Sequence, residues 1–172
     1  MDFFIADTHF FDNNIIKYEN RPFSNPEEML GVITDNWNRT VGQDDRVFVV
    51  GDFADVSKRS EILLNSDMLR SLKGRKYLIR GNHDTESDEF YKECGFEKVY
   101  DFPIVLDGFW ILSHEPLYVN SNMPYANVYG HVHNNPSYRD ASPQSVCVSV
   151  ERIGYQPILF EDIKEKIIRT QE

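Results

Sequence analysis

Short apolar runs that end in metal-binding side chains constrain this chain more than any other feature of its sequence. The runs "FFIA", "RVFVV", "KYLI", "FWIL" and "NVY" are rich in β-branched or aromatic residues and are bounded by polar residues, which is typical of strands. The residues that follow them are Asp7 and His9; Asp52; Asn82, His83 and Asp84; His114; and His131 and His133. Buried polar groups are costly unless something pairs with them, so neighbouring residues or a metal must satisfy these groups.

All five histidines of the chain fall in these endings. Because the carboxyl ends of strands in open α/β sheets converge on one crevice, we expect these side chains to meet in space. Asp7 and His9 are two residues apart, as are His131 and His133, so extended backbone would point both members of each pair to one side. The adjacent Asn82 and His83 should diverge, one as a ligand and the other toward a substrate.

Helical patterns alternate with the early strands. Asn25 and Pro26 are typical of a helix start, with apolar residues at helical spacing up to residue 41. Further helices are expected over residues 57–72, over 88–93 and after 161–162. The alternation predicts βαβ units, and the strand-rich second half, with "VCVSV" and "PILF", predicts a second, more antiparallel sheet. A length of 172 residues favours a single domain, spanning 1–172.

Composition excludes several classes of protein. The net charge is −10, with 28 acidic and 18 basic residues and no run of Lys or Arg, which argues against long nucleic acid as a partner. A small anionic substrate remains compatible, because a metal's charge acts locally whereas surface charges are screened beyond about 8–10 Å. No apolar run approaches the roughly 18 residues of a membrane helix. Cys94 and Cys147 form no CxxC pair, so we expect free thiols and a cytoplasmic protein, with a disulfide as the alternative.

Each ending has an ordinary explanation when it is taken alone. "GD" is a common turn, "GNHD" fits an Asx turn, and a single histidine is more often a core residue than a ligand. The five endings together, in this order, are not explained in that way. Imidazole, carboxylate and amide donors without a thiolate favour Mn, Fe, Zn, Co or Ni over Cu(I), and argue against Ca.

The order of the endings also resembles a known family. D-x-H, G-D, G-N-H-D, a single His and G-H-x-H stand here as "DTH", "GDF", "GNHD", "SHEP" and "GHVH", spanning residues 7–133. This pattern resembles the calcineurin-like metallophosphoesterases, and the flanking sequence is similar to their small, single-domain bacterial and phage members. The resemblance implies a two-sheet β-sandwich flanked by helices, that is, a four-layer α/β/β/α fold, with two divalent metal ions at one edge.

The resemblance also implies a role for each site residue. It assigns Asp7, His9 and His133 to a first metal, Asn82, His114 and His131 to a second, Asp52 to a bridge between them, His83 to catalysis, and Asp84 to the orientation of His83. The expected metal is Mn, with Fe, Zn, Ni or Co as alternatives. The implied reaction is attack on phosphorus by a hydroxide shared between the metals, with His83 assisting the phosphoryl oxygens or the leaving group.

The substrate is less constrained by the sequence. Arg21 and Arg80 have the guanidinium geometry that suits phosphate, but structural ion pairs explain them equally well. A small domain without a cap module favours a phosphodiesterase acting on small or nucleotide-like phosphoesters, with a phosphomonoesterase as the alternative. A non-catalytic interaction module is disfavoured by the complete ligand set, and a DNA exonuclease by the acidic surface.

Overall fold

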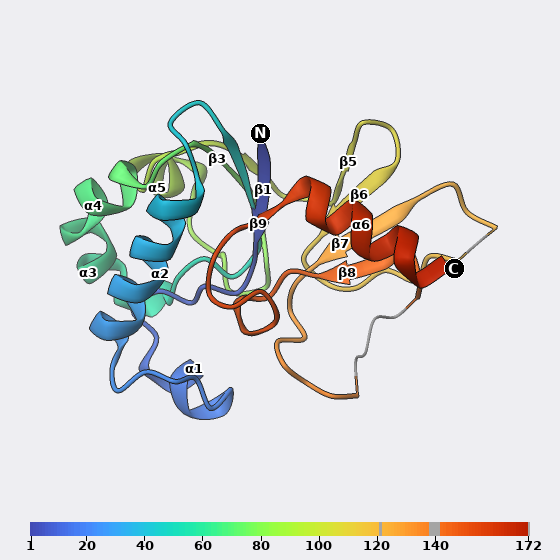
Figure 1. The fold of residues 1–172 in the computed structure, drawn as a ribbon. Helices are drawn as coiled ribbons and strands as arrows, with labels where there is room; N and C mark the ends of the chain where they lie inside the picture. The colour runs from blue at the N-terminus through green and yellow to red at the C-terminus, as the bar shows by residue number, and fades with distance from the viewer. Residues whose placement is uncertain (121, 138–141, 172) are drawn as a thin grey trace.

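The structure, a computed structural model, describes residues 1–120, 122–137 and 142–171. It contains two mixed β-sheets flanked by helices, as the sequence predicted (Figure 1). The first sheet has the order β4-β3-β2-β1-β9, in which β9 is antiparallel to β1 and the other pairs are parallel. Its strands are β1 (Asp2–Ile5), β2 (Arg46–Val50), β3 (Arg75–Ile79), β4 (Phe96–Tyr100) and β9 (Ile158–Leu159).

The second sheet is mostly parallel, so the prediction of a more antiparallel sheet is wrong. Its order is β5-β6-β7-β8, and among the described strands only β5 and β6 pair antiparallel. Long loops after β6 and β7 return the chain to the same starting edge, which makes the following strands parallel. The strands are β5 (Ile104–Leu106), β6 (Trp110–Ser113), β7 (Ala126–Tyr129) and β8 (Ser145–Cys147).

The helices agree with the predicted ones except in one segment. Helix α2 (Pro26–Thr40) begins after Asn25, whose side chain accepts a hydrogen bond from the Glu28 amide, and α5 (Asp88–Glu93) and α6 (Phe160–Gln171) lie where expected. The predicted helix over 57–72 is instead η1 (Val56–Lys58), α3 (Arg59–Leu64) and α4 (Ser66–Ser71). The break is at Asn65, whose amide donates to the Glu61 carbonyl and competes with the backbone. Helix α1 (Asn13–Tyr18), η2 (Val150–Arg152), β4 and β5 were not predicted.

The first sheet has apolar residues on both faces and so contributes to two cores. Phe3 and Ile5 pack in the cluster that contains Trp37 of α2, whereas Phe4 packs in a second cluster with Val128 of β7. In Figure 1, α1 to α5 lie on the side of the first sheet away from the second sheet, and α6 lies beside β7 and β8. Helix α6 adds Phe160 to the second cluster. Successive side chains of β1 therefore point to opposite faces, so β1 packs against the helices on one face and against the second sheet on the other.

Two further expectations concern the cysteines and membranes. Cys94 and Cys147 are both free and buried, which confirms the prediction of free thiols. None of the described helices combines the length and the hydropathy that a membrane span requires.

Candidate metal centre

The site lies where the carboxyl ends of strands from both sheets come together. The chain just after β1 pairs with the chain just after β8: the Ala6 amide donates to the Val148 carbonyl at 2.9 Å, and the Val150 amide donates to the Ala6 carbonyl at 3.1 Å. This bridge joins the ends of the two sheets. Side chains that follow β1, β2 and β3 therefore face side chains that follow β6 and β7.

One group of donor atoms comes from Asp7, His9 and His133, which each place one atom within 4.8 Å of the others. Asp7 and His9 are almost fully buried. The Nε2 atom of His9 is buried and has no hydrogen-bond partner. Buried polar atoms are nearly always paired in folded proteins, so an unpaired imidazole nitrogen here is suited to bind a metal ion. The Asp7 carboxylate of the same group would supply negative charge for that cation.

A second group consists of Asp52, His114 and His131, again with donor atoms within 4.8 Å of one another. The Asn82 Oδ1 atom lies 3.1 Å from His114 Nε2 and 3.0 Å from His131 Nδ1, so this amide oxygen belongs to the same group. The other ring nitrogen of His114, Nδ1, lies 3.0 Å from the Val50 carbonyl. A proton on Nδ1 would leave the lone pair on Nε2, as in metal-binding histidines.

The carboxylate of Asp52 lies between the two groups. Its Oδ2 atom is 3.5 Å from His9 Nε2 in the first group and 3.2 Å from His114 Nε2 in the second. Its Oδ1 atom accepts a hydrogen bond from the His83 amide at 2.9 Å. Asp52 therefore lies close to a histidine of each group.

The electrostatics of the metal-free site also favour positive charge. Burial lowers the pKa of His9, but contacts with Asp12 and Asp52 outweigh burial and raise it to about 9. Burial likewise lowers the pKa of His114, and Asp52 raises it to about 9. Burial raises the pKa of Asp52, yet the two histidines hold it well below its usual range. Protonated imidazoles thus supply, in the metal-free protein, the charge that cations would supply.

The local backbone differs from the extended backbone that was expected. Asp7, His9, His131 and His133 have φ angles of 58°, 46°, 68° and 46°, in the left-handed region. Asp7 and His9 nevertheless lie in one group, as expected, whereas His131 and His133 belong to different groups, so the expectation is wrong for that pair. Asn82 and the exposed His83 do diverge: the His83 ring lies beside His9, with ring centroids 5.3 Å apart.

Asp84 has a different role from the one expected. Its buried carboxylate accepts hydrogen bonds from the backbone amides of Asp52 at 2.7 Å, Phe53 at 3.1 Å and Gly81 at 2.9 Å. These bonds go to the backbone and not to the His83 imidazole. Asp84 therefore fixes the loop after β2 against the loop after β3, which carry Asp52 and His83.

The two arginines considered as phosphate contacts are engaged elsewhere. The buried Arg21 side chain donates to the carbonyls of Asp7 at 2.7 Å and Thr8 at 3.0 Å, and pairs with Glu151 at 2.6 Å. Arg80 pairs with Asp88 at 2.7 Å and Asp101 at 2.8 Å, and also donates to two backbone carbonyls. These contacts fit the structural alternative for both residues.

Sequence reasoning missed two residues that follow β8. The Ser149 hydroxyl donates to Asp7 Oδ2 at 2.6 Å, and Glu151 Oε1 lies 3.1 Å from His133 Nδ1. Burial raises the pKa of Glu151, but His133 and Arg21 outweigh burial and lower it, so the carboxylate is ionised. The run "VCVSV" is followed directly by Glu151, so the rule that found the other endings would have found this one.

Glycines precede the ligands because the site leaves no room for a side chain there. A Cβ atom on Gly51, whose φ is 87°, would lie 2.1 Å from His114 Nδ1. A Cβ atom on Gly81 would lie 2.2 Å from Asp52 Oδ1. Gly51 combines left-handed backbone with this close approach, whereas Gly81 is required by the close approach alone, which explains the "GD" and "GN" dipeptides.

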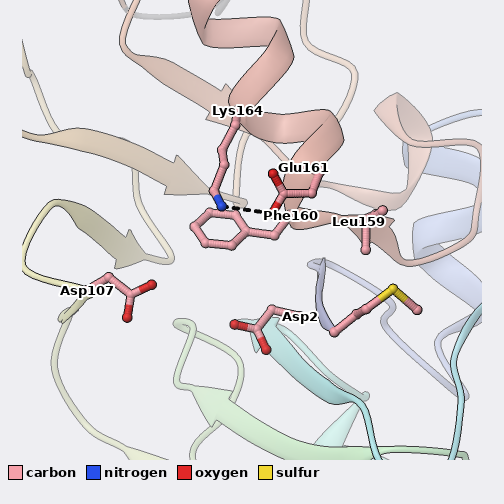
Figure 2. Close-up of a pocket in the computed structure, with 7 residues that line it drawn as sticks. Asp2, Asp107, Leu159, Phe160, Glu161 and Lys164 are labelled. Carbon is pink, nitrogen blue, oxygen red and sulfur yellow. Dashed lines mark hydrogen bonds and ion pairs between the residues drawn. The ribbon is translucent and has the colours of Figure 1, made fainter.

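A cavity of about 440 Å³ adjoins the donor groups. Its lining consists of Glu19, Glu115, Pro116, His131, Val132, His133 and Asn135. Another cavity, of about 290 Å³, lies where β1 begins and contains none of the expected site residues (Figure 2). There Lys164 pairs with Glu161 at 2.8 Å and lies over the Phe160 ring, as the close-up shows. Only the first of these two cavities is placed to hold a substrate of the metal groups.

The chain belongs to the calcineurin-like phosphoesterase family, whose family model matches residues 3–165. It is therefore a phosphoric ester hydrolase of the metal-dependent class, as the sequence motif predicted. It is 35% identical to the uncharacterised protein MJ1445 of Methanocaldococcus jannaschii, over 98% of this chain and 94% of that protein.

Two solved structures have a similar fold. A protein of unknown function, AQ665 of Aquifex aeolicus, has a TM-score of 0.73 and 27% identity, over 96% of this chain and 98% of that one. The nuclease MPE of Pseudomonas putida has a TM-score of 0.54 and 22% identity, over 77% of this chain and 61% of that one.

Proposed function

We propose that this protein is a phosphodiesterase with a dinuclear metal centre that acts on small or nucleotide-like substrates. The observation that carries the proposal is the position of Asp52, whose Oδ2 atom lies 3.5 Å from a histidine of one donor group and 3.2 Å from a histidine of the other. A carboxylate in that position is the usual means of holding two cations side by side.

The donor set supports two divalent ions, with Mn as our first choice and Fe, Zn, Co or Ni as alternatives. Asp7, His9 and His133 would hold one ion, and Asn82, His114 and His131 the other, with Asp52 shared. Such ions polarise phosphoryl oxygens and lower the pKa of a bound water. Asn82 contributes an oxygen without negative charge, which leaves more of the positive charge of the site for the phosphate.

His83 is our candidate for the catalytic acid. It is exposed beside His9 and does not belong to either donor group, so its ring is accessible to a bound ester. It would donate a hydrogen bond to a phosphoryl oxygen, or a proton to the departing alkoxide. The hydrogen bond from its amide to Asp52 fixes the backbone at His83 relative to the proposed bridge.

The cavity beside the donor groups supports a small substrate. Glu19 and Glu115 line it, and no described lysine or arginine does. A polyanionic strand would find no basic side chain there to neutralise the phosphates beyond the one at the metal ions, which disfavours a DNA exonuclease. The volume of about 440 Å³ leaves room for a second ester group, so a diester fits beside the donor groups.

The chemistry can be tested with His83→Ala and a panel of substrates. With added Mn²⁺, the wild type should hydrolyse bis(4-nitrophenyl) phosphate or cyclic nucleotides faster than 4-nitrophenyl phosphate. His83→Ala should keep its metal content while turnover falls by about 100-fold or more. Full activity in this variant would remove His83 from the mechanism, and faster turnover of the monoester would make the protein a phosphomonoesterase.

The dinuclear centre can be tested by counting metal ions. The wild type should bind two Mn²⁺ ions per chain, and Asp52→Asn should weaken both. Asp55→Asn is a matched control, because Asp55 caps η1 three residues further along, and asparagine caps equally well. A wild type that binds one ion or none would refute the dinuclear centre.

A further inference from the structure

A buried ion pair next to the first donor group contacts both of the loops that carry the residues of that group. Arg21 and Glu151 are 130 residues apart in sequence, and their side chains are 0% and 4% exposed. Glu151 contacts His133, whereas Arg21 donates to the backbone carbonyls of Asp7 and Thr8. The pair therefore connects the loop that carries Asp7 and His9 to the loop that carries His133.

We propose that the Arg21–Glu151 pair positions the first donor group for its metal ion, with Glu151 selecting the tautomer of His133. This inference rests on the proposed metal centre. Glu151 Oε1 lies 3.1 Å from Nδ1 of His133 and 2.6 Å from the Arg21 guanidinium, so this acceptor favours the tautomer with its proton on Nδ1. The lone pair is then on Nε2, the nitrogen that lies 3.9 Å from Asp7 Oδ1.

In the second donor group, a neutral acceptor faces the ring nitrogen that would carry the proton. His114 Nδ1 lies 3.0 Å from the Val50 carbonyl, which carries no formal charge. A carboxylate acceptor makes an imidazole a stronger metal ligand than a carbonyl does. The first group should therefore depend on Glu151 for its affinity, whereas the second should not.

Arg21 balances the charge of Glu151 in this arrangement. Its guanidinium contacts Oε1 through Nε at 2.8 Å and Nη2 at 2.6 Å, and so compensates the buried negative charge. Nη1 also donates to the Thr8 carbonyl and Nη2 to the Asp7 carbonyl, the two carbonyls that precede His9 in the chain. A buried ion pair is weak evidence for a role in stability alone.

The test is titration calorimetry of the metal-free protein with Mn²⁺. Glu151→Gln keeps the size of the side chain and a carbonyl oxygen but loses the charge. It should weaken one of the two Mn²⁺ sites by about 10–100-fold and leave the other unchanged. Glu97→Gln is the control, because Glu97 is an exposed carboxylate that also pairs with an arginine, Arg75. Its two affinities should equal those of the wild type.

Arg21→Lys provides a second variant that keeps the positive charge but cannot reach Glu151 and both carbonyls at once. It should weaken the same site as Glu151→Gln does. Nitrogen-15 spectra of the imidazoles should show the His133 proton on Nδ1 in the metal-loaded wild type and a mixture of tautomers in Glu151→Gln. Circular dichroism reports whether each variant is folded.

The outcomes separate this inference from the proposed function. A wild type that binds no Mn²⁺ would refute the metal centre itself. Two unchanged affinities in a folded Glu151→Gln would overturn the positioning role while leaving the metal centre intact. Equal weakening of both sites, or failure of both variants to fold, would show that the pair is structural and would also overturn the proposal.

Discussion

Asp84→Ala should cost stability, because Asp84 holds backbone amides and not the His83 ring. The substitution leaves three amides, those of Asp52, Phe53 and Gly81, without their acceptor. An unsatisfied buried group costs about 1–3 kcal/mol, so three of them cost about 6 kcal/mol at the middle of that range. Burial raises the pKa of Asp84 to about 6, so removing a buried charge offsets part of this cost. The expectation is a loss at the low end of the range for three amides, about 3 kcal/mol.

Urea denaturation followed by circular dichroism measures this loss directly. For a chain of this length, about 3 kcal/mol corresponds to a fall in Tm of roughly 6–12 °C. Asp67→Ala is the control, because Asp67 pairs with Arg70 on the surface with its side chain 95% exposed, and it should lose less than about 0.5 kcal/mol. If Asp84→Ala lost no more than this control, the amides would not depend on the carboxylate and the reasoning would be wrong.

Three further predictions follow from burial and close packing. In metal-free protein, carboxylates outweigh burial and hold the pKa values of His9 and His114 at about 9, above the ordinary 6.5. The folded state then binds more protons than the unfolded chain, so the free energy of unfolding should fall as the pH rises from 6.5 to 9 in the presence of a chelator. Urea denaturation at each pH measures this free energy, and an increase over that range would contradict the prediction. Both cysteine thiols are buried with raised pKa values, so Ellman's reagent should label them only after denaturation, and rapid labelling of native protein would be inconsistent with the fold. Gly51→Ala would place a Cβ atom 2.1 Å from His114 Nδ1 and should weaken one Mn²⁺ site by about 10-fold or more, whereas Gly31→Ala, with nothing within 4 Å, should not.

The donor groups could be predicted from the sequence because strand ends obey a simple geometric rule. Apolar runs identified β1, β2, β3, β6 and β7, and parallel strands place their carboxyl ends at a common edge. The rule needs only the position of the first polar residue after each run. It therefore brought Asp7 and His131, which are 124 residues apart, to one place, where the His131 amide donates to the Asp7 carboxylate.

What could not be predicted depends on contacts between segments distant in sequence. The roles of Asp84 and Arg21 follow from backbone groups that face them, and such groups leave no pattern in the residue letters. His131 and His133 have left-handed backbone although neither is a glycine, so residue type does not reveal this conformation. The edge strand β4, "FEKVY", alternates polar and apolar residues too weakly to stand out beside the buried strands.

The distance in sequence between the two halves of the site has a consequence during synthesis. Asp7 leaves the ribosome 124 residues before His131 does. At about 5–20 residues per second, the nascent chain waits roughly 6–25 s with its first carboxylate and imidazole exposed and their later partners not yet made. An ion bound in that interval would be held by only part of the donor set. The proposed metal centre could therefore be completed only after the later strands have been made.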